Sequence, residues 1–195
     1  MVKIILTKNN ISIPAEVTVT LKSKVLTVQG PKGSIQKSFK NMSLQLLTEK
    51  DANGKISRIL IRKWYSKKKQ RSIVNSVTKH IQNMITGVTQ GFKYTLIYGY
   101  KNKTIEPIAQ EGGKLLVIKN FAGEKFTRKI RCPEGVKVET TSQKTKGKNR
   151  IFVMGIDVEL VGLMASRIKQ SCTIRKKDLR IFVDGIHFFK KEVGY

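Results

Sequence analysis

Three clusters of cationic side chains are the residues in this sequence most able to do chemistry. In chain order, the first cluster is Lys67, Lys68, Lys69 and Arg71, the second is Lys144, Lys146, Lys148 and Arg150, and the third is Arg175, Lys176, Lys177 and Arg180. Ammonium and guanidinium groups bind phosphate oxygens through charge and hydrogen bonds. Clusters of them indicate contact with a polyanion, and nucleic acid is the most common one.

The first cluster lies at the start of a predicted helix. Cations oppose the helix dipole at that end, so helix stability does not explain their position. A bound phosphate would meet both the side-chain charges and the free N–H groups of the first turn. The alternative is a helix end that faces only water, since charge runs often do.

The other two clusters differ in their surroundings. Residues 144–150 are polar and contain Gly147, which predicts a loop that either follows a nucleic-acid backbone or only adds solubility. Apolar residues flank the third cluster closely, so a folded scaffold can hold its cations toward a partner. The nearby Phe188 and Phe189 could stack on bases, although core packing or a protein contact is more typical of Phe.

Signs of catalysis or metal binding are few. His80 and His187 are far apart in sequence, and the turn of residues 30–33 lacks the length and the final residues of a phosphate-binding loop. An acid pair, Asp157 and Glu159, could converge with His187, but a place in the first turn of a helix explains these acids more simply. We therefore expect a protein that is not an enzyme and has no metal, cofactor or small-molecule substrate.

The charge of the whole chain supports a polyanionic partner. The 195 residues include 39 Lys or Arg and 13 Asp or Glu, a formal charge of +26, and both halves of the chain are strongly basic. Apolar residues make up 39% of the sequence, which predicts a folded protein and not a disordered one. The two cysteines, Cys132 and Cys172, are read as buried thiols in a reducing compartment. No segment has the length or composition of a signal peptide or membrane span.

Periodicity predicts the same order of elements twice. Short alternating strands fill residues 17–61, and a helix with an apolar stripe follows over residues 67–85, with Gly87 expected to end it. Strands then recur between residues 92 and 153, before a second helix at about residues 157–171. Three strands match at offsets of 90, 91 and 92, which indicates a duplication. We predict an α+β fold of two duplicated domains, residues 1–88 and 89–195, each a small antiparallel sheet or partial barrel covered by one helix.

Four blocks of sequence resemble a known family. They are residues 82–92 (QNMITGVTQGF), 120–126 (NFAGEKF), 157–161 (DVELV) and 177–186 (KDLRIFVDGI). These look like large-subunit ribosomal protein six, called protein nine in eukaryotes, and the eukaryotic-type version fits best. Shorter matches, such as Lys63-Trp64, extend the resemblance over nearly the whole chain.

The resemblance implies a structural role in the large ribosomal subunit. It implies two homologous α+β domains that bind ribosomal RNA near the sarcin–ricin loop and the docking region for translation factors, chiefly through the second domain. The third basic cluster is then the favoured RNA contact, with the cluster of residues 144–150 as an extension. Neighbouring large-subunit proteins would be further partners, in cytoplasmic ribosomes after nuclear and nucleolar assembly.

Two other classes of protein are alternatives to a ribosomal protein. A basic nucleic-acid-processing enzyme would need a carboxylate or histidine site that converges only in the fold. A peripheral protein of anionic membranes would need basic residues beside an apolar helix face, but both apolar stripes are expected to cover sheets.

Overall fold

The structure of the chain is a computed structural model. It describes residues 5–51, 54–100, 103–141, 149–174, 178 and 180–195. The chain forms two compact units: the first unit ends at Gln90 and the second unit begins at Gly91. Within the described ranges, neither helix combines the length and apolarity needed to cross a membrane.

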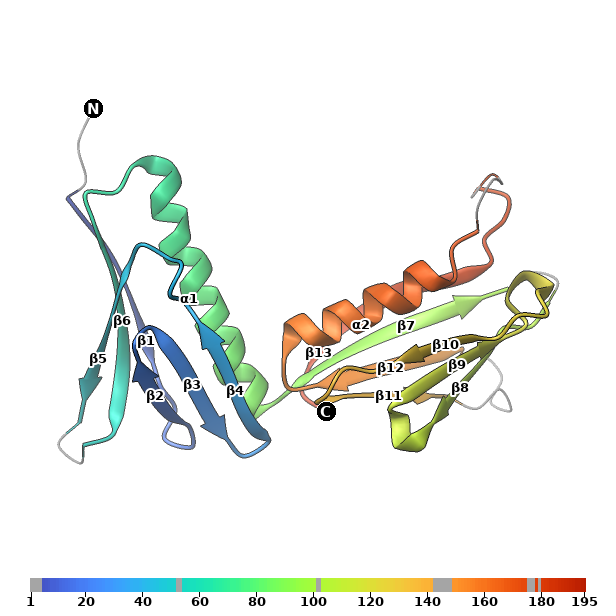
Figure 1. Cartoon of the computed structure of the whole chain (residues 1–195), viewed down its shortest axis with the longest axis horizontal. Coiled ribbons are helices and arrows are strands. Elements are labelled where there is room, and N and C mark those ends of the chain that lie inside the picture. Colours follow the sequence, from blue (N-terminus) through green and yellow to red (C-terminus); the bar gives the residue numbers. More distant parts are fainter. Residues whose placement is uncertain (1–4, 52–53, 101–102, 142–148, 175–177, 179) are drawn as a thin grey trace. The chain divides into compact units, whose positions relative to one another are not determined.

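The first unit contains two three-stranded antiparallel sheets and one helix (Figure 1). Its elements in chain order are β1 (Leu6–Ser12), β2 (Thr18–Lys22), β3 (Val25–Gly30), β4 (Gly33–Ser38), β5 (Gln45–Lys50), β6 (Ile56–Trp64) and α1 (Lys68–Thr89). One sheet has the order β1-β6-β5 and the other the order β2-β3-β4. β2 and β3 form a hairpin, with Ser23 and Lys24 in the left-handed backbone conformation of a tight two-residue turn.

The apolar stripe of α1 covers both sheets of the first unit. Val74, Val77 and Ile81 have no exposed surface, and the helix packs on β1, β3, β4 and β6. The buried strand residues Leu26, Val28, Ile59 and Ile61 complete this core. The stripe expected from the sequence therefore positions α1, and with it the cationic residues at its start.

The end of α1 differs from the expectation. Gly87 is buried inside the helix, which continues to Thr89, and the left-handed residue after the Gln90 cap is Gly91, with a φ of 78°. The turn of residues 30–33 holds this helix end, because the N–H of Lys32 donates to the carbonyl oxygen of Val88 at 3.0 Å. The Lys32 ammonium also donates to the carbonyl oxygen of Gln90 at 2.6 Å, where a cation suits the helix dipole.

The second unit has a four-stranded sheet, a three-stranded sheet and one long helix. Its elements in chain order are β7 (Phe92–Gly99), β8 (Glu106–Gln110), η1 (Glu111–Gly113), β9 (Leu115–Lys119), η2 (Phe121–Gly123), β10 (Arg128–Arg131), β11 (Val136–Thr140), β12 (Arg150–Gly155), α2 (Val158–Ser171) and β13 (Gly185–Val193). The sheets have the orders β11-β12-β7-β13 and β10-β9-β8, and every pair is antiparallel.

The second helix begins where the sequence predicts. Asp157 is its N-cap, and Oδ1 of Asp157 accepts a hydrogen bond from the N–H of Glu159 at 2.9 Å. The apolar face of α2 packs on the larger sheet, mainly on β7, β12 and β13 (Figure 1). Val161, Met164 and Ile168 are fully buried there, at the same spacing as Val74, Val77 and Ile81 in α1.

Strand pairing confirms the duplication. The order β1-β6-β5 in the first unit matches β7-β12-β11 in the second, and β2-β3-β4 matches β8-β9-β10. Leu46 opposes Ile61, and Val138 opposes Val153, so both strands of this pair are related by an offset of 92. The predicted α+β fold with two sheet domains, each covered by one helix, is therefore correct.

One strand match from the sequence is displaced. Val28 of β3 corresponds to Ile118 of β9 at the offset of 90. The residue opposite Val28 is Ile35 in β4, and the residue opposite Ile118 is Arg128 in β10. The match of β4 to β10 therefore has an offset of 93 and not 91. The reason is the connection, which is a tight turn in the first unit and contains η2 in the second. Both offsets are odd, so the alternation of the strand could not distinguish them.

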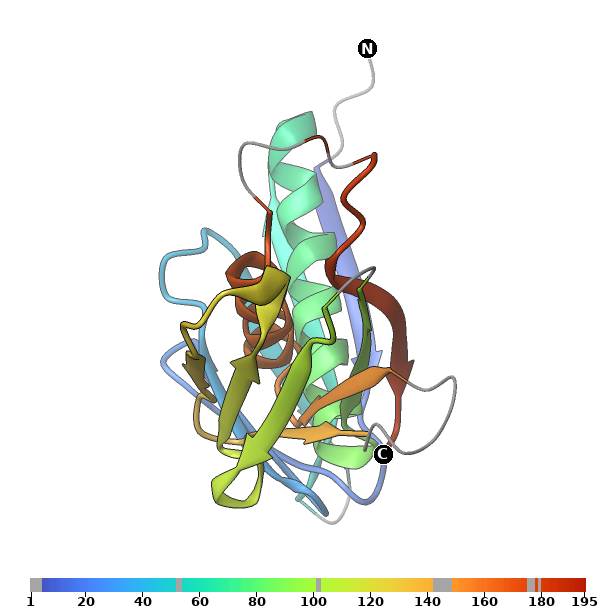
Figure 2. The ribbon, with the colours of Figure 1, turned by 90° about the vertical axis from the view of Figure 1, so that its right-hand side faces the viewer.

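The last strand, β13, has no counterpart among the described residues of the first unit. It adds to the free edge of β7 (Figure 2). Its pairing with β7 shifts register between Phe188 and Lys190. Five consecutive side chains from His187 to Lys191 are exposed, so the strand lacks the apolar alternation that reveals a half-buried strand.

Candidate nucleic-acid interface

The structure places the first cationic cluster at the start of α1, as predicted. Lys67 is the N-cap, Lys68 and Lys69 begin the helix, and all three side chains are exposed. The first turn contains no acidic residue, and none of these three lysines forms an ion pair with a described residue. The cluster therefore presents uncompensated positive charge beside the free N–H groups of the helix.

Arg71 is held more firmly than the three lysines. Its Nε donates to the carbonyl oxygen of Ser66 at 3.4 Å, and its side chain is partly buried. Two large aromatic side chains precede the cluster: Trp64 is 48% exposed and Tyr65 is 80% exposed. The exposed rings and the neighbouring cations form a surface that can bind both bases and phosphates.

Most of the other two clusters lies outside the described residues. This applies to Lys144, Lys146 and Lys148 and to Arg175, Lys176 and Lys177. The structure does place the last member of each cluster. Arg150 begins β12 and is partly buried, and Arg180 lies exposed in a turn in which its N–H donates to Oδ1 of Asp178 at 2.9 Å.

Arg150 is brought beside an aromatic ring that is distant in sequence. Its guanidinium carbon lies 5.2 Å from the centre of the Phe189 ring, although β7 runs between their strands. The ammonium of Lys169, in α2, lies 5.5 Å from the centre of the Phe188 ring. Phe188 is 46% exposed and Phe189 is 56% exposed, so core packing is the wrong interpretation for these two phenylalanines. The cause is the edge position of β13, which gives its side chains few neighbours.

Two more rings on the larger sheet lie next to lysine ammonium groups. The ammonium of Lys93 is 4.3 Å from the centre of the Phe152 ring, and that of Lys191 is 5.4 Å from the centre of the Tyr94 ring. Cation–π contacts of this kind hold long basic side chains over rings and keep their charge accessible. These residues could not be recognised from the sequence, because no local spacing connects β7, β12 and β13.

The acids and histidines have local roles. Asp157 caps α2, and Nε2 of His187 lies 3.4 Å from the carbonyl oxygen of Val183. His80 lies in α1 with its Nδ1 3.2 Å from the ammonium of Lys37. In the part of the chain that the structure describes, no three His, Cys, Asp or Glu side chains gather as metal ligands would.

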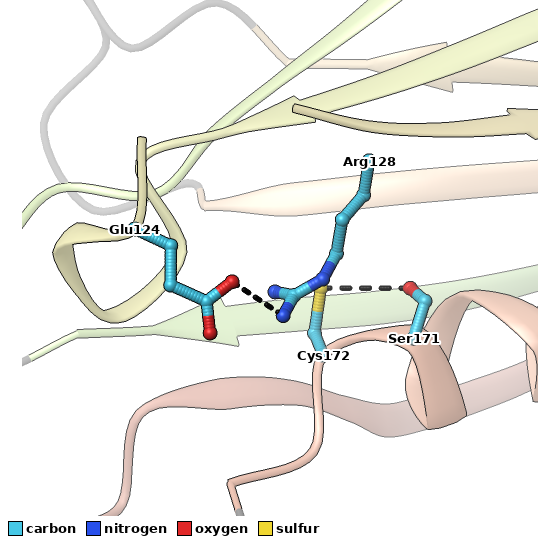
Figure 3. A network of polar contacts seen from close by, with 4 residues as sticks. All are labelled: Glu124, Arg128, Ser171 and Cys172. Atoms are coloured by element: carbon cyan, nitrogen blue, oxygen red, sulfur yellow. Dashed lines mark hydrogen bonds and ion pairs between the residues drawn. The ribbon is translucent and has the colours of Figure 1, made fainter. Parts of the chain in front are cut away.

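A polar network surrounds one of the two cysteines (Figure 3). Arg128 donates from Nη2 to Oε2 of Glu124 at 2.6 Å, and its guanidinium lies 4.4 Å above the Phe121 ring. Cys172 lies beside Arg128 and 3.6 Å from the hydroxyl of Ser171. Burial raises the pKa of the Cys172 thiol, and the contacts with Ser171 and Arg128 only partly oppose this. The neutral thiol is therefore the stable form, as expected for a buried cysteine.

Comparison with known proteins identifies the family. The family model described as ribosomal protein L6 matches residues 13–91. The chain is 34% identical over 190 residues to large ribosomal subunit protein uL6 of Tetrahymena thermophila, covering 97% of each protein. It is 35% identical over 177 residues to uL6A of Schizosaccharomyces pombe, covering 91% of this chain and 88% of the relative.

A relative from Aeropyrum pernix, also named large ribosomal subunit protein uL6, is 35% identical over 183 residues, with 94% of this chain and 93% of the relative covered. These similarities span both units and confirm the resemblance seen in the four sequence blocks. With its two sheet-and-helix units and its near full-length match to these relatives, the chain belongs to the ribosomal protein L6 family.

Proposed function

We propose that this protein is a structural constituent of the large ribosomal subunit and binds ribosomal RNA. The observation that carries the proposal is the similarity over 97% of the chain to a protein named for that subunit. The role requires no reacting group. It requires a folded, strongly basic surface that remains attached to RNA.

The described cations support this role physically. RNA binding replaces the counterions around phosphates with Lys and Arg side chains, and their release favours association. The exposed lysines at the start of α1 carry charge that no described acid neutralises. The aromatic rings on β12 and β13 add surfaces on which unpaired bases stack.

The finer proposal concerns location. The site lies near the sarcin–ricin loop and the docking region for translation factors, and the second unit is the main anchor. Arg150 and Arg180 belong to the basic segments that carry this contact, and the α1 start is a second contact. Neighbouring ribosomal proteins complete the surroundings, in cytoplasmic translation after assembly in the nucleolus.

Sedimentation tests the proposal directly. Cells that express the tagged protein are lysed, and the lysate is separated on a high-salt sucrose gradient. We expect the tag to remain with the large subunit, because many phosphate contacts and a matched RNA shape resist salt together. Release of the tag into the top fractions would instead indicate a transient factor or simple polycation binding, and would overturn the proposal.

A further inference from the structure

A cavity of about 780 Å³ lies in the second unit, at the C-terminal end of α2. Its walls come from η2 and the following loop, from β10, from the last turn of α2, and from Thr173, Ile174, Phe182 and Asp184. Its polar lining includes Glu124, Arg128, Ser171, Thr173 and Asp184. This volume is in the range of small-molecule sites and exceeds that of one nucleobase.

One wall of the cavity is already ordered. The Arg128 guanidinium forms an ion pair with the Glu124 carboxylate at 2.6 Å (Figure 3). On its other side the guanidinium lies 4.4 Å from the centre of the Phe121 ring. The ion pair uses Oε2 of Glu124, and the Glu124 side chain remains 46% exposed. Its carboxylate is therefore held in a defined position in which the other oxygen, Oε1, can accept further hydrogen bonds.

The chemistry of the lining favours a base over a phosphate. Two carboxylates, those of Glu124 and Asp184, line the cavity and offset the cations Arg128 and Lys103, so the lining has no net positive charge to attract the sugar–phosphate backbone. A nucleobase edge instead combines donors and acceptors, and the lining offers both kinds of partner. The 39% exposed Phe182 ring also lines the cavity and supplies a surface for stacking.

Among the bases, guanine fits these groups best. Its N1–H and N2–H₂ donors lie side by side and can both bond a carboxylate, and its O6 and N7 accept from Arg or Lys. The lining contains carboxylates together with Arg128 and Lys103. Sequence-specific recognition of RNA commonly takes unstacked bases from single-stranded loops into such surroundings.

From these observations, we infer that the cavity binds an unstacked guanine base of an RNA loop. The inference rests on the proposed function, because it assumes that RNA approaches the second unit. It adds a base-specific contact to a surface that otherwise binds phosphates. The exposed Arg180 follows Asp178 in the same segment and would meet the backbone outside the cavity.

Binding of short RNA probes tests the inference. Fluorescence anisotropy compares single-stranded probes that differ only in one central base, G, A, C or U, on the full chain. We expect about tenfold tighter binding of the G probe, the discrimination of one good two-point base contact. Equal binding of all four probes would overturn the inference, even if the protein joins ribosomes normally.

Variants locate the contact. Glu124→Gln keeps the shape and an oxygen that can accept from Arg128, but removes the charge that favours guanine. We expect it to abolish the preference for G while the A, C and U probes bind as before. Glu134→Gln changes an exposed carboxylate that does not line the cavity, and should keep the preference.

Two outcomes would contradict the location. If Glu124→Gln tightened binding of all four probes equally, the cavity would border the phosphate backbone instead. If it kept the preference for G, the guanine contact would lie elsewhere. Thermal unfolding of each variant checks that the second unit is folded, and loss of ribosome association on the sucrose gradient would count against the proposed function and not against this cavity.

Discussion

Gly30 and Val88 are in such close contact that a side chain at residue 30 has no space. A Cβ atom there would lie 2.8 Å from Cγ2 of Val88 and 3.0 Å from the Val88 carbonyl oxygen. Gly30 ends β3 and Val88 lies in the last turn of α1, so this contact joins a sheet to the helix that covers it.

Gly30→Ala is expected to destabilise the first unit by about 1 to 3 kcal/mol, the usual result of forcing extra atoms into a packed site. Denaturant unfolding measures the effect. Gly162→Ala is the matched control. Gly162 is inside α2, and a Cβ added there would have its nearest neighbouring atom 3.9 Å away. That control should stabilise the second unit by about 0.5 to 1 kcal/mol, and equal effects of the two changes would contradict the close contact.

Changing Lys67, Lys68 and Lys69 to Gln should have two opposite effects. RNA binding should weaken, and the slope of log affinity against log salt should become shallower by about 2. The first unit should become slightly more stable, because the cations oppose the α1 dipole. Anisotropy titrations at several salt concentrations and thermal unfolding measure the two effects.

The matched control removes three exposed lysines elsewhere in the first unit, Lys22, Lys40 and Lys50. It loses the same charge but no helix-start contact, so its salt slope should change less. If both triple variants had the same salt slope, the helix start would not be a specific contact.

Replacing Arg175, Lys176, Lys177 and Arg180 with Ala should weaken rRNA association and lower its salt dependence. This follows from the loss of up to four phosphate contacts in the unit proposed as the main anchor. Filter binding to large-subunit rRNA at several salt concentrations measures both quantities. An unchanged affinity with an unchanged slope would remove this segment from the interface.

Phe189→Ala should weaken binding of single-stranded RNA by about 1 to 3 kcal/mol, the range for loss of one base stack. The salt slope should stay the same, because the ring carries no charge. Val193→Ala, at another exposed position on β13, is the control and should bind as the unchanged protein does. An effect of Phe189→Ala confined to the salt slope would indicate that the ring only positions Arg150.

The Cys172 thiol should make the second unit less stable in alkaline solution. Burial raises its pKa, so the folded thiol stays neutral where the unfolded one begins to ionise. Its contribution is complete below the unfolded pKa of about 8.5 and decreases as pH rises toward the folded value. Unfolding midpoints at pH 7 to about 9.5 should fall less steeply in Cys172→Ala; parallel curves would contradict the assignment.

The sequence predicted those elements in which burial follows a simple period. The apolar stripes of α1 and α2 are examples, and both helices begin within one residue of the expected position. The sequence places both Asp157 and Glu159 in the first turn of α2, whereas the structure has Asp157 as the N-cap and only Glu159 in that turn. Three strands were missed: β1, β11 and β13. In β1 the polar Asn9 lies against the helix, where its amide donates to Asn75 and Thr78 of α1, so polarity does not mark the exposed face.

The candidate site was less predictable than the fold. Basic runs identify residues that can bind phosphate, but the pairing of Arg150 with Phe189 depends on the order of three strands. The end of α1 was also not predictable from the sequence near it. Either Gly87 or Gly91 could have ended α1, and tertiary packing of Val88 on Gly30 determined that the later one does.

The additional strand β13 also distinguishes two halves that otherwise share one plan. Internal repeats can exchange strands while they fold, and such mispairing is a characteristic failure of duplicated proteins. Here β7 has a second partner, β13, whereas its counterpart β1 is an edge strand in the described part of the first unit. Because residues 185–193 return to pair with β7, a misplaced strand of the first unit would have to displace β13 before it could pair with β7 on that side.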